Sequence, residues 1–225
     1  LVKKKKFKAI VTAGPTREYL DPVRYISNES SGKQGYEIAL ALNKLGIETT
    51  LIIGPSSLIS QKSIKTKKIV TADEMFTEVK KSLPVDIAVC SAAVSDFKPI
   101  KKNKNKFKKD QSYLTSIQFK KNKDILEFLS KNNRHRPRIV VGFSAETENL
   151  NKNSILKMRK KNCDLIIAND VSKKDKGFNS DYNEVSIIDS DGNTKIIKKN
   201  KKSFIANKIA EVIMDKLLID DRNFN

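Results

Sequence analysis

The feature of this sequence that most constrains its fold is a regular alternation of short apolar runs with longer segments of helical period. The apolar runs lack a polar residue at every second position, which is typical of strands covered on both faces of a sheet. Strand, helix and strand joined by short connections form parallel β-α-β units. We therefore predict an α/β fold with a three-layer, doubly wound, Rossmann-like sheet that is mostly parallel. The predicted strands span 7–12, 48–53, 86–91, 114–120, 139–143 and 164–168, and the predicted helices span 35–45, 71–83, 124–130 and 153–161.

The last part of the chain has a different pattern. Two apolar runs, 185–189 and 194–197, flank Ser190-Asp191-Gly192-Asn193, which predicts a C-terminal antiparallel hairpin followed by a helix over 203–218. A chain of 225 residues with 38% hydrophobic residues can bury one core. We predict a single domain over 1–225 with a basic leader at 1–6. No apolar run reaches the roughly 18 residues that a membrane-spanning helix needs, so no membrane partner is expected.

The net charge is strongly positive and has three possible interpretations. Lys and Arg number 45 against 26 Asp and Glu, which gives a formal net charge of +19. Such a charge raises the possibility of nucleic-acid binding, but the lysines are spread along the chain and no DNA- or RNA-binding motif is present. The lysines can also serve solubility, or they can attract small polyanions. No nucleic-acid partner is expected.

The cysteines bear on the cellular compartment. Cys90 and Cys163 have no spacing that suggests a metal site or a disulfide framework. Free thiols are typical of a reducing compartment. We therefore expect a cytoplasmic protein.

In a doubly wound sheet, ligands bind beyond the carboxyl ends of the strands. The segment after the first predicted strand contains neither GxGxxG nor GxxxxGK[ST], which excludes the ordinary dinucleotide and Walker sites. It does contain Ser30-Ser31-Gly32-Lys33 immediately before a predicted helix. Hydroxyls and backbone N–H groups at a helix N-terminus can bind an anion, although simple capping of the helix by Ser30 or Ser31 is an alternative.

Three further segments follow predicted strands or lie near them. The small residues of 90–95 let a flat group approach the backbone, and Asp96 can accept hydrogen bonds or cap a helix. The lysines of 101–109 repel one another, which predicts a mobile loop that stays open until an anion arrives, with a merely solvated loop as the alternative. Lys157 and Lys161 are four residues apart on one predicted helical face, so both can reach one phosphate chain.

Together these motifs resemble those of the bacterial phosphopantothenoylcysteine synthetases (phosphopantothenate–cysteine ligases), the C-terminal domain of a bifunctional coenzyme A biosynthesis flavoprotein. The resemblance covers nearly the whole chain and implies the same three-layer α/β fold. The matching stretches are Ala13–Glu18, Asp21–Asn28, Ser30–Lys33, Ala92–Asp96, Gly142–Thr147, Ala168–Val171 and Gly177–Asp181.

The resemblance implies a CTP-dependent ligation of 4′-phosphopantothenate to L-cysteine in coenzyme A biosynthesis. The carboxylate attacks the α-phosphate of CTP, expels pyrophosphate and leaves an acyl-cytidylate. The amine of cysteine then displaces CMP and gives 4′-phosphopantothenoylcysteine. Mg²⁺ would bridge phosphate oxygens of CTP and need few protein ligands, so no residue is assigned to it. No flavin is expected in this chain.

The resemblance also implies roles for individual residues. Asn28 would contact the activated carbonyl, Arg24 would suit an anionic group, and Lys106 would close on the reacting phosphate, with Lys104 or Lys108 as alternatives. The implied nucleotide-binding residues are Cys90, Ser91, Ala92, Asp96, Lys106, Lys123, Asp124, Ile125, Leu126, Phe143, Lys157 and Lys161. The implied phosphate- or substrate-binding residues are Gly14, Ser30, Ser31, Gly32 and Lys33.

One motif departs from the family pattern. The family usually reads Asn-Pro-Asp-Ile-Leu where this chain reads Asn122-Lys123-Asp124-Ile125-Leu126, so the preorganised helix start that Pro provides is missing. Family members of this type are dimers, and we expect a homodimer. The domain often follows a flavin-dependent decarboxylase domain, and the start at Leu1 leaves open whether that partner has been removed.

Overall fold

The computed structural model describes residues 6–108, 117–131, 134–170 and 180–223, with side chains up to 219. In these residues the main sheet has eight strands in the order β12-β11-β10-β9-β6-β1-β4-β5. Neighbouring strands from β10 to β5 pair in parallel, and β11 and β12 pair antiparallel. The strands are β1 (Lys8–Ala13), β4 (Glu48–Ile53), β5 (Lys65–Lys68), β6 (Ile87–Cys90), β9 (Ile139–Glu146), β10 (Leu165–Asp170), β11 (Tyr182–Asp189) and β12 (Thr194–Lys201).

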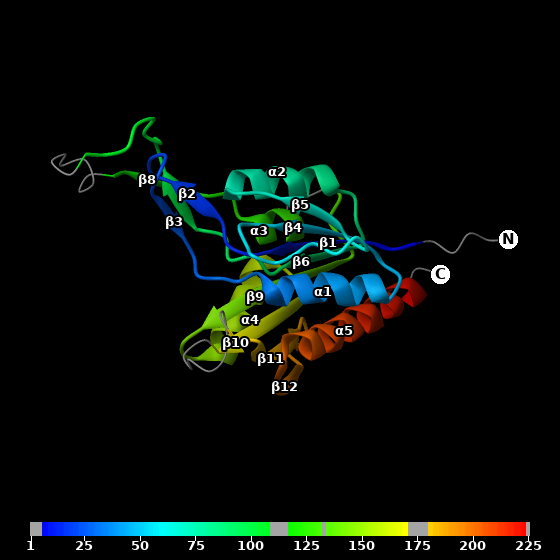
Figure 1. Cartoon of the computed structure of the whole chain (residues 1–225). Helices are drawn as coiled ribbons and strands as arrows, with labels where there is room; N and C mark the ends of the chain where they lie inside the picture. Colours follow the sequence, from blue (N-terminus) through cyan, green and yellow to red (C-terminus); the bar gives the residue numbers. More distant parts are fainter. Residues whose placement is uncertain (1–5, 109–116, 132–133, 171–179, 224–225) are drawn as a thin grey trace.

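Helices cover both faces of the main sheet and make the three layers (Figure 1). Side chains alternate between the faces of a strand, and β1 shows the consequence: Val11 packs in the core under α1 and α5, whereas Ile10 packs in the core under α2, α3 and α4. The buried strands therefore contribute to two separate cores. The helices are α1 (Lys33–Lys44), α2 (Ala72–Ser82), α3 (Ile125–Ser130), α4 (Leu150–Lys161) and α5 (Lys202–Asn223).

Two small antiparallel sheets extend from the main sheet beside each other (Figure 1). They pair β2 (Arg17–Tyr19) with β3 (Tyr25–Ser27), and β7 (Phe97–Pro99) with β8 (Phe119–Lys121). Asp21 closes the first of these hairpins, because its Oδ1 accepts the backbone N–H groups of Val23 and Arg24 at 2.7 and 2.8 Å. We call these four strands the arm.

The predicted α/β architecture and the C-terminal hairpin are confirmed. The helix predicted over 71–83 is α2, and Thr71 caps it in a capping box, with Thr71 Oγ1 accepting the backbone N–H of Glu74. The predicted strand over 114–120 is wrong in its extent. Residues 114–116 lie outside the described part, and Phe119–Lys121 pairs in the arm rather than in the main sheet. The leader at 1–6 also lies outside the described residues, except for Lys6.

Within the described residues, no helix is both long enough and apolar enough to cross a lipid bilayer.

Candidate active site

Two adjoining cavities lie at the edge of the main sheet where the parallel strands end. The large cavity has a volume of about 520 Å³ and the small cavity about 170 Å³. Both are lined by Ala92, Val94, Asp96, Phe143 and Lys157, so these five residues form the junction between them. This is the edge at which ligands bind in open α/β sheets.

Most residues predicted for the site line these cavities. Of the predicted residues outside the junction, those that line the large cavity are Asn28, Ser30, Ser31, Gly32, Lys33 and Ser91. Those that line the small cavity are Cys90, Lys123, Asp124, Ile125, Leu126 and Lys161. Segments that are far apart in the sequence therefore meet at one edge of the sheet.

The N-terminus of α1 forms one wall of the large cavity. Gly32 precedes the helix in the left-handed region, with φ of 75°, and a Cβ there would lie 3.1 Å from the Cα of Gly14. Gly14 thus contributes by allowing this close approach of two backbone segments. Ser30 Oγ accepts the backbone N–H of Gly32 at 3.2 Å and Ser31 Oγ that of Lys33 at 3.5 Å, and the first turn of α1 holds no acidic residue. The partial positive charge of the helix end therefore faces the cavity without a fixed counter-charge.

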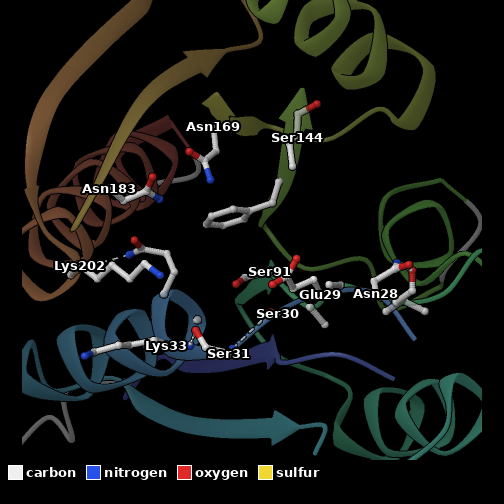
Figure 2. Close-up of a pocket in the computed structure, with 18 of the residues that line it drawn as sticks. Asn28, Glu29, Ser30, Ser31, Lys33, Ser91, Ser144, Asn169, Asn183 and Lys202 are labelled. Carbon is white, nitrogen blue, oxygen red and sulfur yellow. Dashed lines mark hydrogen bonds between the residues drawn. The ribbon is translucent and has the colours of Figure 1, made fainter. Parts of the chain in front are cut away.

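Asn28 lies on the opposite side of the large cavity from Asn183 and Lys202 (Figure 2). Its Nδ2 donates a hydrogen bond of 3.0 Å to the backbone carbonyl of Val94. An amide nitrogen carries two hydrogens, so this bond uses one of them and fixes the direction of the other. Because Val94 belongs to the junction, Asn28 is held where the contents of the two cavities meet.

Lys157 and Lys161 are two of the cations that line the small cavity, and both have partners within the protein. Lys157 Nζ donates to the backbone carbonyl of Phe143 at 2.8 Å. Lys161 Nζ lies 2.7 Å from Asp124 Oδ2 and 3.0 Å from Glu127 Oε2. Burial alone would lower the pKa of Lys161, but the hydrogen bonds to the two carboxylates raise the pKa above its ordinary value. Lys161 is therefore a fixed positive charge.

The thiol of Cys90 also faces the small cavity. Burial raises the pKa of Cys90 far above its ordinary value, since desolvation disfavours the thiolate. The thiol of Cys90 therefore stays protonated and neutral at the wall of the cavity, and it does not act as a nucleophile.

The departure from the family motif at Lys123 leaves the start of α3 intact. Asp124 is the N-cap of α3 and accepts the backbone N–H of Glu127 at 2.8 Å. Asn122 fixes the preceding turn, because its Nδ2 donates to the carbonyl of Ser95 at 2.8 Å. Lys123 turns toward Phe76, whose ring centre lies 4.8 Å from Lys123 Nζ. Side-chain capping thus supplies the helix start that Pro would have preorganised.

Two residues predicted to be catalytic, Arg24 and Lys106, line neither cavity. Arg24 Nη2 donates to the carbonyl of Phe107 at 3.4 Å, and Arg24 Nη1 lies 3.6 Å from Asp21 Oδ2. Phe107 is buried, and its backbone N–H donates to Asp21 at 3.2 Å. The lysine loop is therefore attached to the arm through Phe107, while the neighbouring Lys106 is exposed. Lys109, the last residue of the predicted loop, lies outside the described part.

Among the residues of the large cavity that were not predicted as site residues, three come from β10, β11 and the start of α5: Asn169, Asn183 and Lys202 (Figure 2). Asn169 did fall in a matching motif, at the carboxyl end of β10. Asn183 is the second residue of β11, and Lys202 follows β12. In an antiparallel hairpin at the edge of a parallel sheet, these two ends lie at the same edge as the carboxyl ends of the parallel strands. The predicted hairpin therefore indicated which ends of its strands reach the site, but it did not single out Lys202 from the neighbouring lysines.

A family model described as the DNA/pantothenate metabolism flavoprotein C-terminal domain matches residues 4–217 of this chain. The chain belongs to this family. Curated relatives include two proteins named coenzyme A biosynthesis bifunctional protein CoaBC. The protein from Escherichia coli K12 is 40% identical over 217 residues, and the protein from Haemophilus influenzae is 39% identical over 204 residues.

This family domain forms only part of those relatives. The matches cover 95% and 90% of this chain but 52% and 50% of the E. coli and H. influenzae proteins, so the chain spans about half of their length. A solved structure described as the C-terminal domain of CoaBC matches with a TM-score of 0.78 and 30% identity, and covers 96% of both chains. The two chains thus align over nearly the whole length of each.

Proposed function

We propose that this domain is a phosphopantothenate–cysteine ligase of coenzyme A biosynthesis that uses CTP and forms an acyl-cytidylate. The observation that carries the proposal is the junction between the two cavities. A ligase of this kind must bring a nucleotide and an acid together at the α-phosphate, and two adjoining cavities with Asn28 bonded to Val94 of the junction suit that task.

The small cavity is the proposed nucleotide site. Cytosine would lie against the backbone near Ala92, with Phe143 beside the base, and Asp96 would accept a hydrogen bond from the nucleotide. Lys157 and Lys161 would contact the phosphates. Lys161 is already paired with Asp124. A phosphate that binds there would either replace Asp124 as the partner of Lys161 or bind Lys161 together with Asp124.

The large cavity is the proposed site of 4′-phosphopantothenate. In the first step a carboxylate oxygen attacks the α-phosphorus of CTP, the bond from that phosphorus to the β-phosphate oxygen breaks, and pyrophosphate leaves. In the second step the amine of cysteine attacks the acyl carbon, the bond to CMP breaks, and the amine loses a proton. Asn28 would donate its second amide hydrogen to the acyl oxygen, where negative charge develops.

Mg²⁺ would supply charge neutralisation on the phosphates of CTP. Asp96 and Asp124 are the carboxylates that border the small cavity, and carboxylate oxygens are ligands that Mg²⁺ accepts. Within the described residues no group of three or more His, Cys, Asp and Glu is gathered. A Mg²⁺ ion coordinated mainly by the phosphates of CTP would need only one or two protein ligands. The carboxylates of the small cavity are therefore sufficient to hold it.

The proposal includes a cytoplasmic homodimer. The arm supports a dimer, because Val23, Tyr25 and Ile26 expose large apolar side chains. Arg24 and Lys106 lie near this arm, so in a dimer they could act at a cavity of the partner. Light scattering tests this, and a monomer at all concentrations would contradict it.

The deciding experiment measures pyrophosphate release from CTP and from ATP, with 4′-phosphopantothenate present and cysteine withheld. We expect release with CTP and an acyl-cytidylate detectable by mass spectrometry. A protein that binds a short oligonucleotide but releases no pyrophosphate would overturn the proposal in favour of nucleic-acid binding.

A further inference from the structure

Lys202 is an unusual lysine because it is buried: its exposed fraction is 3%. It begins α5 and lines the large cavity, and Figure 2 shows its side chain extending toward the cavity interior. Burying an ammonium group is costly unless an anion or hydrogen-bond acceptors compensate for the lost water. Lys202 therefore places a buried positive charge at the wall of the large cavity.

Several contacts hold Lys202 in position. Its backbone N–H donates to the carbonyl of Asp181 at 2.9 Å, and its carbonyl accepts from Gln34 Nε2 at 3.3 Å. These bonds link the start of α5 to the segment before β11 and to the first turn of α1. The ammonium group is thus attached to a rigid part of the fold, which suits the recognition of a fixed ligand group.

The surroundings of Lys202 are positive overall. Lys33 from α1 pairs with Asp181 at 2.5 Å, so the carboxylate near Lys202 is already the partner of another ammonium group. The first turns of α1 and α5 contain no acidic residue, and both helix N-termini lie at this end of the cavity. Each of these features favours an anion.

Unsatisfied amide groups give a second, independent indication of a ligand at this end. Within the described part of the chain, the buried Oδ1 of Asn169 and the buried Oε1 of Gln34 have no hydrogen-bond partner. Both residues line the large cavity, as does Asn183, whose exposed fraction is 3%. Buried polar atoms in native proteins are normally paired, so a polar ligand is expected to complete them.

We propose that Lys202, together with Lys33 and Asn183, binds the phosphate group of 4′-phosphopantothenate at the end of the large cavity opposite Asn28. This inference rests on the proposed function. The carboxylate of that substrate must reach the junction near Asn28, and its phosphate is at the other end of the molecule. The phosphates of CTP would instead meet Lys157 and Lys161 in the small cavity. Lys202 is then a specificity residue that distinguishes the phosphorylated acid from pantothenate.

The test compares Lys202→Met with Lys201→Met, which removes the exposed lysine next to it in the sequence. We expect Lys202→Met to raise KM for 4′-phosphopantothenate about tenfold to hundredfold, as for loss of one charge-assisted hydrogen bond. KM for CTP should change less than about twofold, and Lys201→Met should behave as wild type. An unchanged KM for 4′-phosphopantothenate, or a rise in KM for CTP instead, would overturn the inference.

A binding experiment separates this inference from the proposed function. Titration calorimetry with 4′-phosphopantothenate and with pantothenate should show preference for the phosphorylated ligand in wild type and loss of that preference in Lys202→Met. The ligand preference can be measured even if wild type releases no pyrophosphate. In that case the proposed function fails, while the role of Lys202 in phosphate binding is still tested. Should Lys202→Met not fold, Lys202→Gln retains a polar end group and must show the same loss of preference; equal preference in wild type and variant would refute the role of Lys202.

Discussion

Lys161 Nζ lies 2.7 Å from Asp124 Oδ2, so a cation proposed to contact phosphate is paired with the residue that caps α3. Glu127 adds a second carboxylate at 3.0 Å. The pair fixes the lysine at the wall of the small cavity before any ligand arrives. Positioning of this kind reduces the entropy lost when an anion binds.

Lys161→Met should therefore weaken CTP binding. A hydrogen bond to a charged group contributes about 1.5–3 kcal/mol, so we expect KM for CTP to rise roughly tenfold to hundredfold. Steady-state kinetics at saturating 4′-phosphopantothenate measure this. Lys160→Met is the control, because Lys160 is exposed on the same helix. Equal KM values for both variants and wild type would show that Lys161 does not contact the nucleotide.

Asn28→Asp should separate the two half-reactions. Aspartate has no hydrogen to donate to the Val94 carbonyl or to an acyl oxygen, and its charge would oppose developing negative charge. We expect pyrophosphate release to continue while ligated product falls about 10²- to 10³-fold, with acyl-cytidylate accumulating. Rapid quenching followed by mass spectrometry detects that intermediate. Asn43→Asp, near the other end of α1, should ligate normally, whereas normal ligation by Asn28→Asp would remove Asn28 from the mechanism.

Lys106→Gln should abolish the first half-reaction. Lys106 is exposed, but the buried Phe107 beside it attaches the loop to the arm, so closure on a phosphate would start from a defined position. Pyrophosphate release without cysteine is the measurement. Lys104→Gln and Lys108→Gln decide between the three loop lysines, and Lys62→Gln, at an exposed site elsewhere, is the control. Undiminished release by Lys106→Gln would refute its role.

The main sheet could be predicted from the sequence because burial leaves a strong pattern. β1, with Ile10 and Val11 facing two cores, needs apolar residues on both faces, and α2 carries its own start signal at Thr71. The arm could not be predicted in this way. Its strands have three residues each, and those of β3 are all exposed, so neither length nor burial distinguishes them from a loop. Pairing and the Asp21 turn form them instead.

The candidate site likewise contains some residues that could be predicted from the sequence and others that could not. Ser30 to Lys33 could be found because they precede a periodic helix, whereas Asp124 was found through the family motif that it resembles. Lys202 could not be distinguished from its neighbours, since it ends a stretch rich in lysine, 198–202. Lysine is almost never fully buried without a partner, so nothing in the sequence favours burial of this one. Only the packing of α5 against α1 places it inside the large cavity.

Gly35→Ala should destabilise the fold by moving α1 away from the sheet. A Cβ at Gly35 would lie 2.7 Å from the Cβ of Ala13, which has no rotamer to change. Alanine favours the helix by about 1 kcal/mol, but overpacking costs about 1–3 kcal/mol, so we expect a net loss of up to about 2 kcal/mol. Urea unfolding measures it. Lys44→Ala, at the exposed end of α1, should stay within about 0.5 kcal/mol; equal stability of both variants would contradict the close contact.

The pH dependence of substrate binding should follow Lys202. Burial lowers the pKa of Lys202 to about 8; the nearby Lys33 ammonium acts in the same direction, and Asp181 opposes it. The substrate phosphate is a dianion above about pH 7, so the ammonium is the group that changes as pH rises further. About nine-tenths of Lys202 is charged at pH 7 and about one-tenth at pH 9, and we expect KM for 4′-phosphopantothenate to rise up to tenfold over that range. In Lys202→Met this rise should be absent, while the same rise in wild type and variant would assign the dependence to another group.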